Sequence, residues 1–229
     1  MSKNLFITGT GTDIGKTYLT GLILKKLRES GASAAYFKAA MSGSSRDKEG
    51  SLTAGDSVKI KEMSKINQNI DEMCPYIYET AVSPHLAAHI ENNPVNMEII
   101  LKKFKNLCDK YEYITVEGSG GVICPIRMDG EEIWLTDIIK TLGLGCLIVA
   151  DAGLGTINSV GLTSFYMKQN NIPIKGIIFN NFDPENIMHR DNIKMCEYLT
   201  KEKVIAAVKK DDNDIDISIE LLKSLYTEG

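Results

Sequence analysis

The stretch that decides the fold is NLFITGTGTDIGKTYLT, residues 4–20. Residues 5–7 form a short apolar run suited to a strand buried on both faces, and residues 16–28 carry apolar side chains at helical spacing. Between them lies a glycine loop that ends in Gly15, Lys16 and Thr17. This order predicts a phosphate-binding loop, in which Lys16 reaches the β/γ-phosphates and the Thr17 hydroxyl ligates Mg²⁺.

The loop departs from the usual pattern G-x-x-x-x-G-K-[ST]. Five residues separate Gly9 from Gly15, and Thr10 occupies the expected glycine position. A glycine-rich turn with a purely structural role is the alternative interpretation. The strand before the loop and the helix after it favour nucleotide binding.

Composition is typical of an enzyme of the cytoplasm. The chain has 229 residues with 43% hydrophobic content, enough for one α/β core, so we expect a single domain over residues 1–229. A formal net charge of −4 without a basic stripe argues against nucleic acid as a partner. No apolar run approaches membrane-spanning length, and the N-terminus lacks a signal-peptide pattern, so we expect no membrane partner. The five cysteines form no C-x-x-C pair and are expected to be reduced.

Strand and helix patterns alternate along the rest of the chain. Further strands are predicted at residues 34–38, 113–117, 146–150, 175–180 and 204–208. Helices are predicted at residues 56–63, 84–91, 97–111, 136–142, 158–169, 186–199 and 214–226. The alternation predicts a mainly parallel sheet with helices on both faces and ligands at the carboxyl ends of the strands. The polar segment 42–55 is expected to be a mobile loop beside that edge.

Candidate functional residues follow the ends of the predicted strands. Lys38 closes the second strand, and Ser42 follows it closely. Asp56 opens a helix, where an N-terminal cap is a sufficient explanation. Glu117 ends an apolar strand and precedes four small residues, which is unusual for a solvated carboxylate. Together with Thr17, the two carboxylates form a set of oxygen ligands that Mg²⁺ prefers.

Seven segments in order resemble one family. They are GTGTDIGKT, FKAAMSGS, GDS, SPHLAAH, VEGSGG, VADAGLGTINS and GIIFNN, which lie between residues 9 and 181. Their combination is similar to dethiobiotin synthetase, in which the longer gap in the phosphate loop is the usual form. The resemblance implies a single-domain P-loop NTPase-like fold, a homodimer, and ATP- and Mg²⁺-dependent closure of a cyclic urea from 7,8-diaminononanoate and CO₂.

The resemblance also assigns site residues. Lys16 and Lys38 would stabilise the carbamate and the transferring phosphoryl group, with Ser42 beside them, while Thr17, Asp56 and Glu117 would hold Mg²⁺. Substrate would contact Thr12, Lys38 and Ser42. The nucleotide site would comprise Thr12, Asp13, Ile14, Gly15, Lys16, Thr17, Tyr18, Asp56, Glu117, Gly118, Ser119, Gly120, Asn180 and Asn181.

A second site is implied at a helix start in the segment GLGTINS, residues 153–159. In the family, residues matching Gly155, Thr156, Ile157 and Asn158 receive the substrate carboxylate from the partner subunit. A helix N-terminus suits a carboxylate because its first N–H groups lack helical partners. The alternative is an ordinary helix start near Asn158, with Asn158 as its cap.

Three departures limit the resemblance. Ala39 stands where the family has proline, which is expected to loosen the placement of Lys38. The late segment AAVKK, residues 206–210, lacks the family's glycine and proline before the adenine-binding loop, so the residues near Lys209 stay unassigned. Asn192 falls near the place of a tyrosine that sometimes contacts substrate.

Other functions are weighed on three further patterns. FNNFD, residues 179–183, resembles the base-reading motif of GTPases, but Asn181 replaces its lysine, and a turn after a strand is the structural alternative. A partitioning-type P-loop ATPase would carry an extra lysine where Thr10 or Gly11 stands. His85 and His89 lie four apart, but no further metal ligands are spaced to join them.

Overall fold

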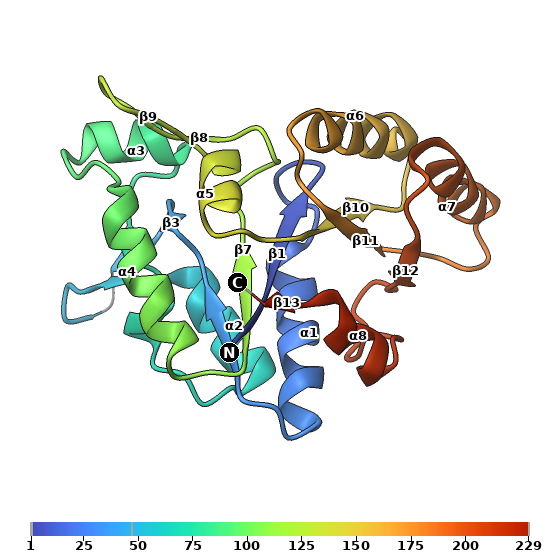
Figure 1. The fold of residues 1–229 in the computed structure, drawn as a ribbon, viewed down its shortest axis with the longest axis horizontal. Helices are drawn as coiled ribbons and strands as arrows, with labels where there is room; N and C mark the ends of the chain where they lie inside the picture. Colours follow the sequence, from blue (N-terminus) through green and yellow to red (C-terminus); the bar gives the residue numbers. More distant parts are fainter. Residues whose placement is uncertain (1, 47, 229) are drawn as a thin grey trace.

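The computed structural model describes residues 2–46 and 48–228, which fold around one seven-stranded central sheet (Figure 1). Its strands are β1 (Lys3–Gly9), β2 (Ala34–Phe37), β7 (Tyr113–Glu117), β10 (Cys146–Asp151), β11 (Ile174–Asn180), β12 (Val204–Ala207) and β13 (Thr227–Glu228). The order is β12-β11-β10-β1-β7-β2, and every neighbouring pair in it is parallel. Only β13 is antiparallel, where it pairs with the start of β1. The mainly parallel sheet predicted from the sequence is therefore confirmed.

Helices cover both faces of the sheet. They are α1 (Lys16–Glu29), α2 (Gly55–Ser64), α3 (Pro84–Ile90), α4 (Met97–Cys108), α5 (Leu135–Thr141), α6 (Thr156–Gln169), α7 (Ile187–Thr200) and α8 (Ile219–Leu225), with the 3₁₀ turn η1 (Ile70–Glu72). Side chains of β1 alternate between two buried clusters, because successive residues of a strand point to opposite faces. Leu5 and Ile7 pack with α1, α2 and α8, whereas Phe6 packs with α4, α5 and α6.

Short strands outside the central sheet were not predicted. They are β3 (Ala40–Met41), β4 (Ser45–Arg46), β5 (Leu52–Thr53), β6 (Tyr76–Ile77), β8 (Pro125–Met128) and β9 (Glu132–Trp134). β4 and β5 pair as an antiparallel hairpin within segment 42–55, which was predicted to be a loop. β3 pairs with β6 directly after Lys38, so this pair fixes the chain as it leaves the edge of the sheet.

Two predicted helices have different starts. The last one begins at Ile219 rather than at residue 214, because Ile215 and Ile217 are buried in an extended segment and the Ser218 side chain accepts the Leu221 N–H at 3.1 Å. α6 begins at Thr156, with Gly155 as its N-cap at a φ of 89°. Asn158 therefore lies inside the first turn, and the alternative that it caps the helix was wrong.

Candidate active site

The phosphate loop joins β1 to α1 at the carboxyl edge of the sheet. Gly15 precedes the helix in the left-handed region, with a φ of 95°, and a Cβ atom there would lie 2.1 Å from the Asn180 amide nitrogen. A side chain at position 15 would therefore push Asn180 away. Asp13 also has a positive φ, of 57°, and accommodates the longer turn between Gly9 and Gly15.

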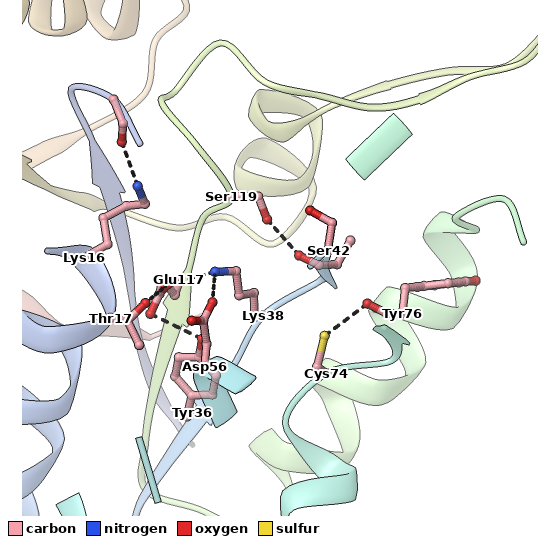
Figure 2. A network of polar contacts seen from close by, with 12 residues as sticks. Lys16, Thr17, Tyr36, Lys38, Ser42, Asp56, Cys74, Tyr76, Glu117 and Ser119 are labelled. Carbon is pink, nitrogen blue, oxygen red and sulfur yellow. Dashed lines mark hydrogen bonds and ion pairs between the residues drawn. The ribbon is translucent and has the colours of Figure 1, made fainter. Parts of the chain in front are cut away.

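Lys16 is folded back onto its own loop. Its Nζ donates to the Gly11 carbonyl at 2.7 Å, and the residue is only 7% exposed (Figure 2). Burial lowers the pKa of Lys16; the Lys38 ammonium adds to this effect, while the Glu117 carboxylate opposes it. In this conformation the Lys16 ammonium is hydrogen-bonded to the backbone of its own loop.

Lys38 bridges two carboxylates beside the loop (Figure 2). Its Nζ lies 2.7 Å from Oδ2 of Asp56 and 2.9 Å from Oε1 of Glu117. The same Glu117 oxygen accepts the Thr17 hydroxyl at 2.8 Å, and Oε2 accepts the Tyr36 hydroxyl at 3.2 Å. We call these residues, Thr17, Tyr36, Lys38, Asp56 and Glu117, the Lys38 cluster.

Neighbouring elements explain why the Lys38 cluster assembles. Glu117 and Lys38 lie at or just beyond the carboxyl ends of adjacent parallel strands, β7 and β2, and therefore emerge at the same edge. The Lys38 N–H donates to the Met73 carbonyl at 2.8 Å, which fixes the backbone even though Ala39 follows. Asp56 lies in the first turn of α2, whose N-cap is Ala54. The Asp56 carboxylate binds Lys38, so the alternative that Asp56 is simply the N-cap of this helix was wrong.

Electrostatics keep Lys38 charged. Burial alone would lower the pKa of Lys38, but the carboxylates of Glu117 and Asp56 together outweigh it, and the pKa lies above its ordinary range. The Glu117 side chain has no exposed surface, and that of Asp56 is 26% exposed. Burial and the Glu117 carboxylate raise the pKa of Tyr36 well above its ordinary value, so this phenol stays protonated.

A cavity of about 1080 Å³ brings most of the predicted residues together. The predicted residues that line it are Thr12, Asp13, Gly15, Lys16, Thr17, Tyr18, Lys38, Ser42, Asp56, Glu117, Ser119 and Gly120. Sequence reasoning missed four apolar residues that line the cavity, which we call its apolar arm: Met41, Val82, Pro84 and Ile123. Met41 lies in β3, Pro84 opens α3, and Val82 and Ile123 lie in loops. Met41 and Pro84 fall within the segments FKAAMSGS and SPHLAAH, but sequence reasoning gave these apolar side chains no role.

Two serines of the cavity wall hold loops in place. The Ser42 hydroxyl donates to the Val82 carbonyl at 2.6 Å, and the Ser119 hydroxyl donates to the Ala40 carbonyl at 2.7 Å. In this structure both hydroxyls are engaged with backbone groups. Ser42 therefore shapes the cavity next to Lys38.

The remaining predicted nucleotide residues lie around the loop and do not line the cavity. The Asn180 amide donates to the Ile14 carbonyl at 3.0 Å, and its buried Oδ1 has no partner among the described residues. Asn181 turns away and donates to Asp151 at 2.6 Å. Gly118 is packed against Phe6 and Leu135.

The aspartate of the GTPase-like pattern has a local role. Asp183 accepts the Glu185 N–H at 2.9 Å, which forms a turn after β11. This contact matches the structural alternative rather than guanine recognition. Tyr18, at the start of α1, donates to the Asp212 carbonyl and so links the helix to the unassigned segment after β12.

The start of α6 lines a different cavity of about 550 Å³, which shares no lining residue with the first in the part of the chain described. Gly155, Ile157 and Asn158 line it, whereas Thr156 is buried with an unpartnered hydroxyl. Asn192 donates to the carbonyls of Ala152 and Gly153 at 2.9 and 3.1 Å. Asn192 thus braces the loop that leads into the helix.

Two negative observations apply to the described residues. They contain no group of three or more His, Cys, Asp or Glu side chains that could hold a metal ion. Within the same residues, no helix has the length and apolar character needed to cross a bilayer.

The arrangement suits phosphoryl transfer to an anionic acceptor. A phosphate loop supplies backbone donors and Lys16, and a second cation, Lys38, lies at the adjacent strand end. The carboxylates of Asp56 and Glu117 lie within hydrogen-bond distance of the Lys38 ammonium, and the Thr17 hydroxyl donates to Glu117. Catalysis of this kind depends on positioning and on stabilising negative charge.

Solved structures share the fold at low sequence identity. The MinC:MinD cell division complex of Aquifex aeolicus matches with a TM-score of 0.57 and 14% identity, covering 98% of this chain and 86% of the other. A ParA family ATPase from Chlorobium tepidum TLS matches with a TM-score of 0.55 and 14% identity, covering 93% of this chain and 87% of the other. These similarities confirm the P-loop NTPase-like fold.

Sequence relatives are much closer. The AAA domain family AAA_26 matches residues 3–214. ATP-dependent dethiobiotin synthetase BioD of Clostridium botulinum (strain Loch Maree / Type A3) is 47% identical over 230 residues, covering 100% of both chains. BioD of Brachyspira hyodysenteriae is 46% identical over 226 residues, covering 96% of this chain and 100% of the relative. The chain therefore belongs to the family of ATP-dependent dethiobiotin synthetases.

Proposed function

We propose that the chain closes the ureido ring of dethiobiotin from 7,8-diaminononanoate and CO₂, with ATP as co-substrate, through a carbamate and a carbamic-phosphoric anhydride. The observation that carries this proposal is Lys38, a buried ammonium held beside the phosphate loop at 2.7 and 2.9 Å from two carboxylates. A partitioning ATPase or a small GTPase is not favoured, because relatives at 46–47% identity over nearly the whole chain are named ATP-dependent dethiobiotin synthetases.

The reaction has three steps. A substrate amine attacks CO₂ and loses a proton, which gives a carbamate. A carbamate oxygen attacks the γ-phosphorus of ATP, and ADP leaves. The second amine then attacks the carbamoyl carbon, phosphate leaves with the bridging oxygen, and loss of a proton completes the ring.

Named residues have distinct tasks in these steps. Negative charge builds up on the carbamate and on the transferring phosphoryl group, so preorganised cations and N–H donors lower the barrier. Lys38 lies at the strand end that faces the cavity and would stabilise both groups, while Lys16 would leave Gly11 to bind the phosphates. Thr12 and Asp13 would line the substrate and phosphate site, and the apolar arm with Met41 and Val82 would take the alkyl chain.

The Lys38 cluster fits Mg²⁺ by its donor set. One hydroxyl, from Thr17, and two carboxylates, from Asp56 and Glu117, are hard oxygen ligands, and Mg²⁺ binds such ligands together with water and phosphate oxygens. The ion would neutralise charge on the nucleotide phosphates. In the structure Lys38 compensates the two carboxylates, and it becomes available to the substrate once another cation takes over that role.

The enzyme would act as a homodimer. Exposed apolar side chains gather on α6 and α7, which pack together: Leu162 and Phe165 are 62% and 64% exposed, and Tyr198 and Leu199 are 71% and 53% exposed. Leu154, 93% exposed, continues this surface to the start of α6. A second copy seated there would bring the helix start to the partner's cavity, where it would receive the substrate carboxylate.

The enzyme would work in the cytoplasm. The five cysteines are free thiols, and free thiols fit a reducing compartment.

Isotope transfer tests this order of steps. When the reaction starts from ¹⁸O-labelled bicarbonate in ordinary water, the released phosphate is expected to carry one labelled oxygen, because the bridging oxygen originates in the carbamate. Mass spectrometry of the phosphate measures this at early times, before the label exchanges with water. Unlabelled phosphate alongside ring product would contradict the anhydride, and it would mean that water attacks ATP.

A further inference from the structure

Tyr36 lies beneath the candidate active site and has no direct access to the cavity. The residue is fully buried, and its hydroxyl lies 3.2 Å from Oε2 of Glu117 (Figure 2). The phenol donates this bond to the carboxylate oxygen. Glu117 is thus held through both oxygens, with Oε2 toward Tyr36 and Oε1 toward Thr17 and Lys38.

The sheet register sets this geometry. Tyr36 of β2 pairs with Thr115 of β7, and Glu117 lies two residues further along the same strand. Side chains two residues apart share a face of a sheet, so Tyr36, Lys38 and Glu117 project to the same side. The Tyr36 hydroxyl therefore contacts one oxygen of the Glu117 carboxylate, and the other oxygen contacts Lys38 and Thr17.

The backbone of Tyr36 is also held. β2 is the edge strand of the sheet, so part of its backbone lacks a strand partner. The buried side chain of Gln68 fills this gap: it accepts the Tyr36 N–H at 2.7 Å and donates to the Tyr36 carbonyl at 2.9 Å. Both hydrogen bonds fix Tyr36 along the strand direction and thereby fix its hydroxyl under Glu117.

We propose that Tyr36 is a positioning residue, whose hydroxyl holds Oε2 of Glu117 so that Oε1 stays directed at the metal and nucleotide side of the cavity. This inference rests on the proposed role of Glu117 in holding Mg²⁺. Groups that orient a metal ligand from behind typically change metal affinity by ~10–100-fold when they are removed. Tyr36 would act through Glu117 and would touch neither substrate nor nucleotide.

The test compares ADP binding with and without Mg²⁺, measured by calorimetry on the full chain. Wild-type protein is expected to bind ADP more tightly when Mg²⁺ is present. In Tyr36→Phe this gain should shrink ~10-fold, whereas ADP affinity in EDTA should stay within ~2-fold. Glu117→Gln should abolish most of the gain.

Tyr226→Phe is the matched control. Tyr226 is also buried in the cluster that contains Tyr36, and its hydroxyl lies 2.6 Å from the Thr115 hydroxyl, away from the cavity. Both variants remove one hydroxyl from one buried ring, so both should lower the melting temperature of the free protein. Only Tyr36→Phe should reduce the Mg²⁺-dependent gain.

The outcomes separate this inference from the proposed function. A wild-type protein without any Mg²⁺-dependent gain would refute the metal role of Glu117 itself. A normal gain in wild type and an equal gain in Tyr36→Phe would overturn the positioning role alone. Equal losses of ADP affinity with and without Mg²⁺, or a Tyr36→Phe chain that does not fold, would also overturn it, because Tyr36 would then be a purely structural residue.

Discussion

Lys38→Ala is expected to lower turnover by at least ~10², because a preorganised cation at the developing negative charge contributes about this much. Lys38 is 7% exposed and lies beside the phosphate loop. Bulk water therefore cannot easily take over its role in stabilising the developing negative charge. Affinity for ADP should change far less, since the loop backbone and Lys16 remain. Steady-state production of ADP, with calorimetric ADP binding, measures the two effects separately.

Stability must be followed in the same variant. Removing Lys38 leaves Glu117 and Asp56 without their cation, and breaking a buried ion pair costs about 3–5 kcal/mol. Added Mg²⁺ should restore part of the melting temperature by compensating the carboxylates. Lys140→Ala, which removes an exposed lysine bonded to Asn170, serves as the control and should keep normal turnover. Near-normal turnover in folded Lys38→Ala would remove Lys38 from the mechanism.

Asn158→Asp should weaken binding of diaminononanoate strongly while leaving ADP affinity unchanged. Asn158 is exposed, lines the cavity at the start of α6 and is nearly isosteric with aspartate. A carboxylate placed there would repel the carboxylate of the substrate at a site that otherwise offers free N–H groups. The expected effect is a KM for diaminononanoate raised by ~10-fold or more, on the scale of losing a charge-assisted contact.

Mixing two defective chains then tests whether the site is shared. Dimers that combine Lys38→Ala with Asn158→Asp contain one site with both residues intact. Random exchange of equal amounts makes about half of the dimers mixed, so roughly a quarter of wild-type kcat/KM should return. The assay is run well below KM, with each variant alone as the blank. If exchanging dimers of both variants recover no activity, the carboxylate is bound within one chain or elsewhere.

Sequence reasoning succeeded where chemistry and topology coincide. Lys16 and Thr17 follow directly from the loop pattern, and Lys38 and Glu117 could be paired because parallel strands end at one edge of the sheet. The structure adds the contacts among them, such as the 2.9 Å separation of Lys38 and Glu117. Their roles in binding metal and substrate stay predictions.

Other features depend on packing that no local pattern records. Tyr36 is indistinguishable in sequence from a core aromatic residue, and only the register of β2 with β7 places its hydroxyl under Glu117. Asn192 lies 40 residues along the chain from Ala152, whose carbonyl accepts its hydrogen bond. The apolar arm of the cavity likewise combines residues from separate segments of the chain, so it forms only when the chain is folded.

The most direct test of the central claim is product formation. The full chain is mixed with Mg²⁺, ATP, ¹³C-bicarbonate and 7,8-diaminononanoate, and the products are analysed by mass spectrometry. We predict dethiobiotin that carries one ¹³C atom, formed together with one ADP per ring and absent when any single component is omitted. ADP release that proceeds without diaminononanoate and yields no labelled dethiobiotin would contradict the account.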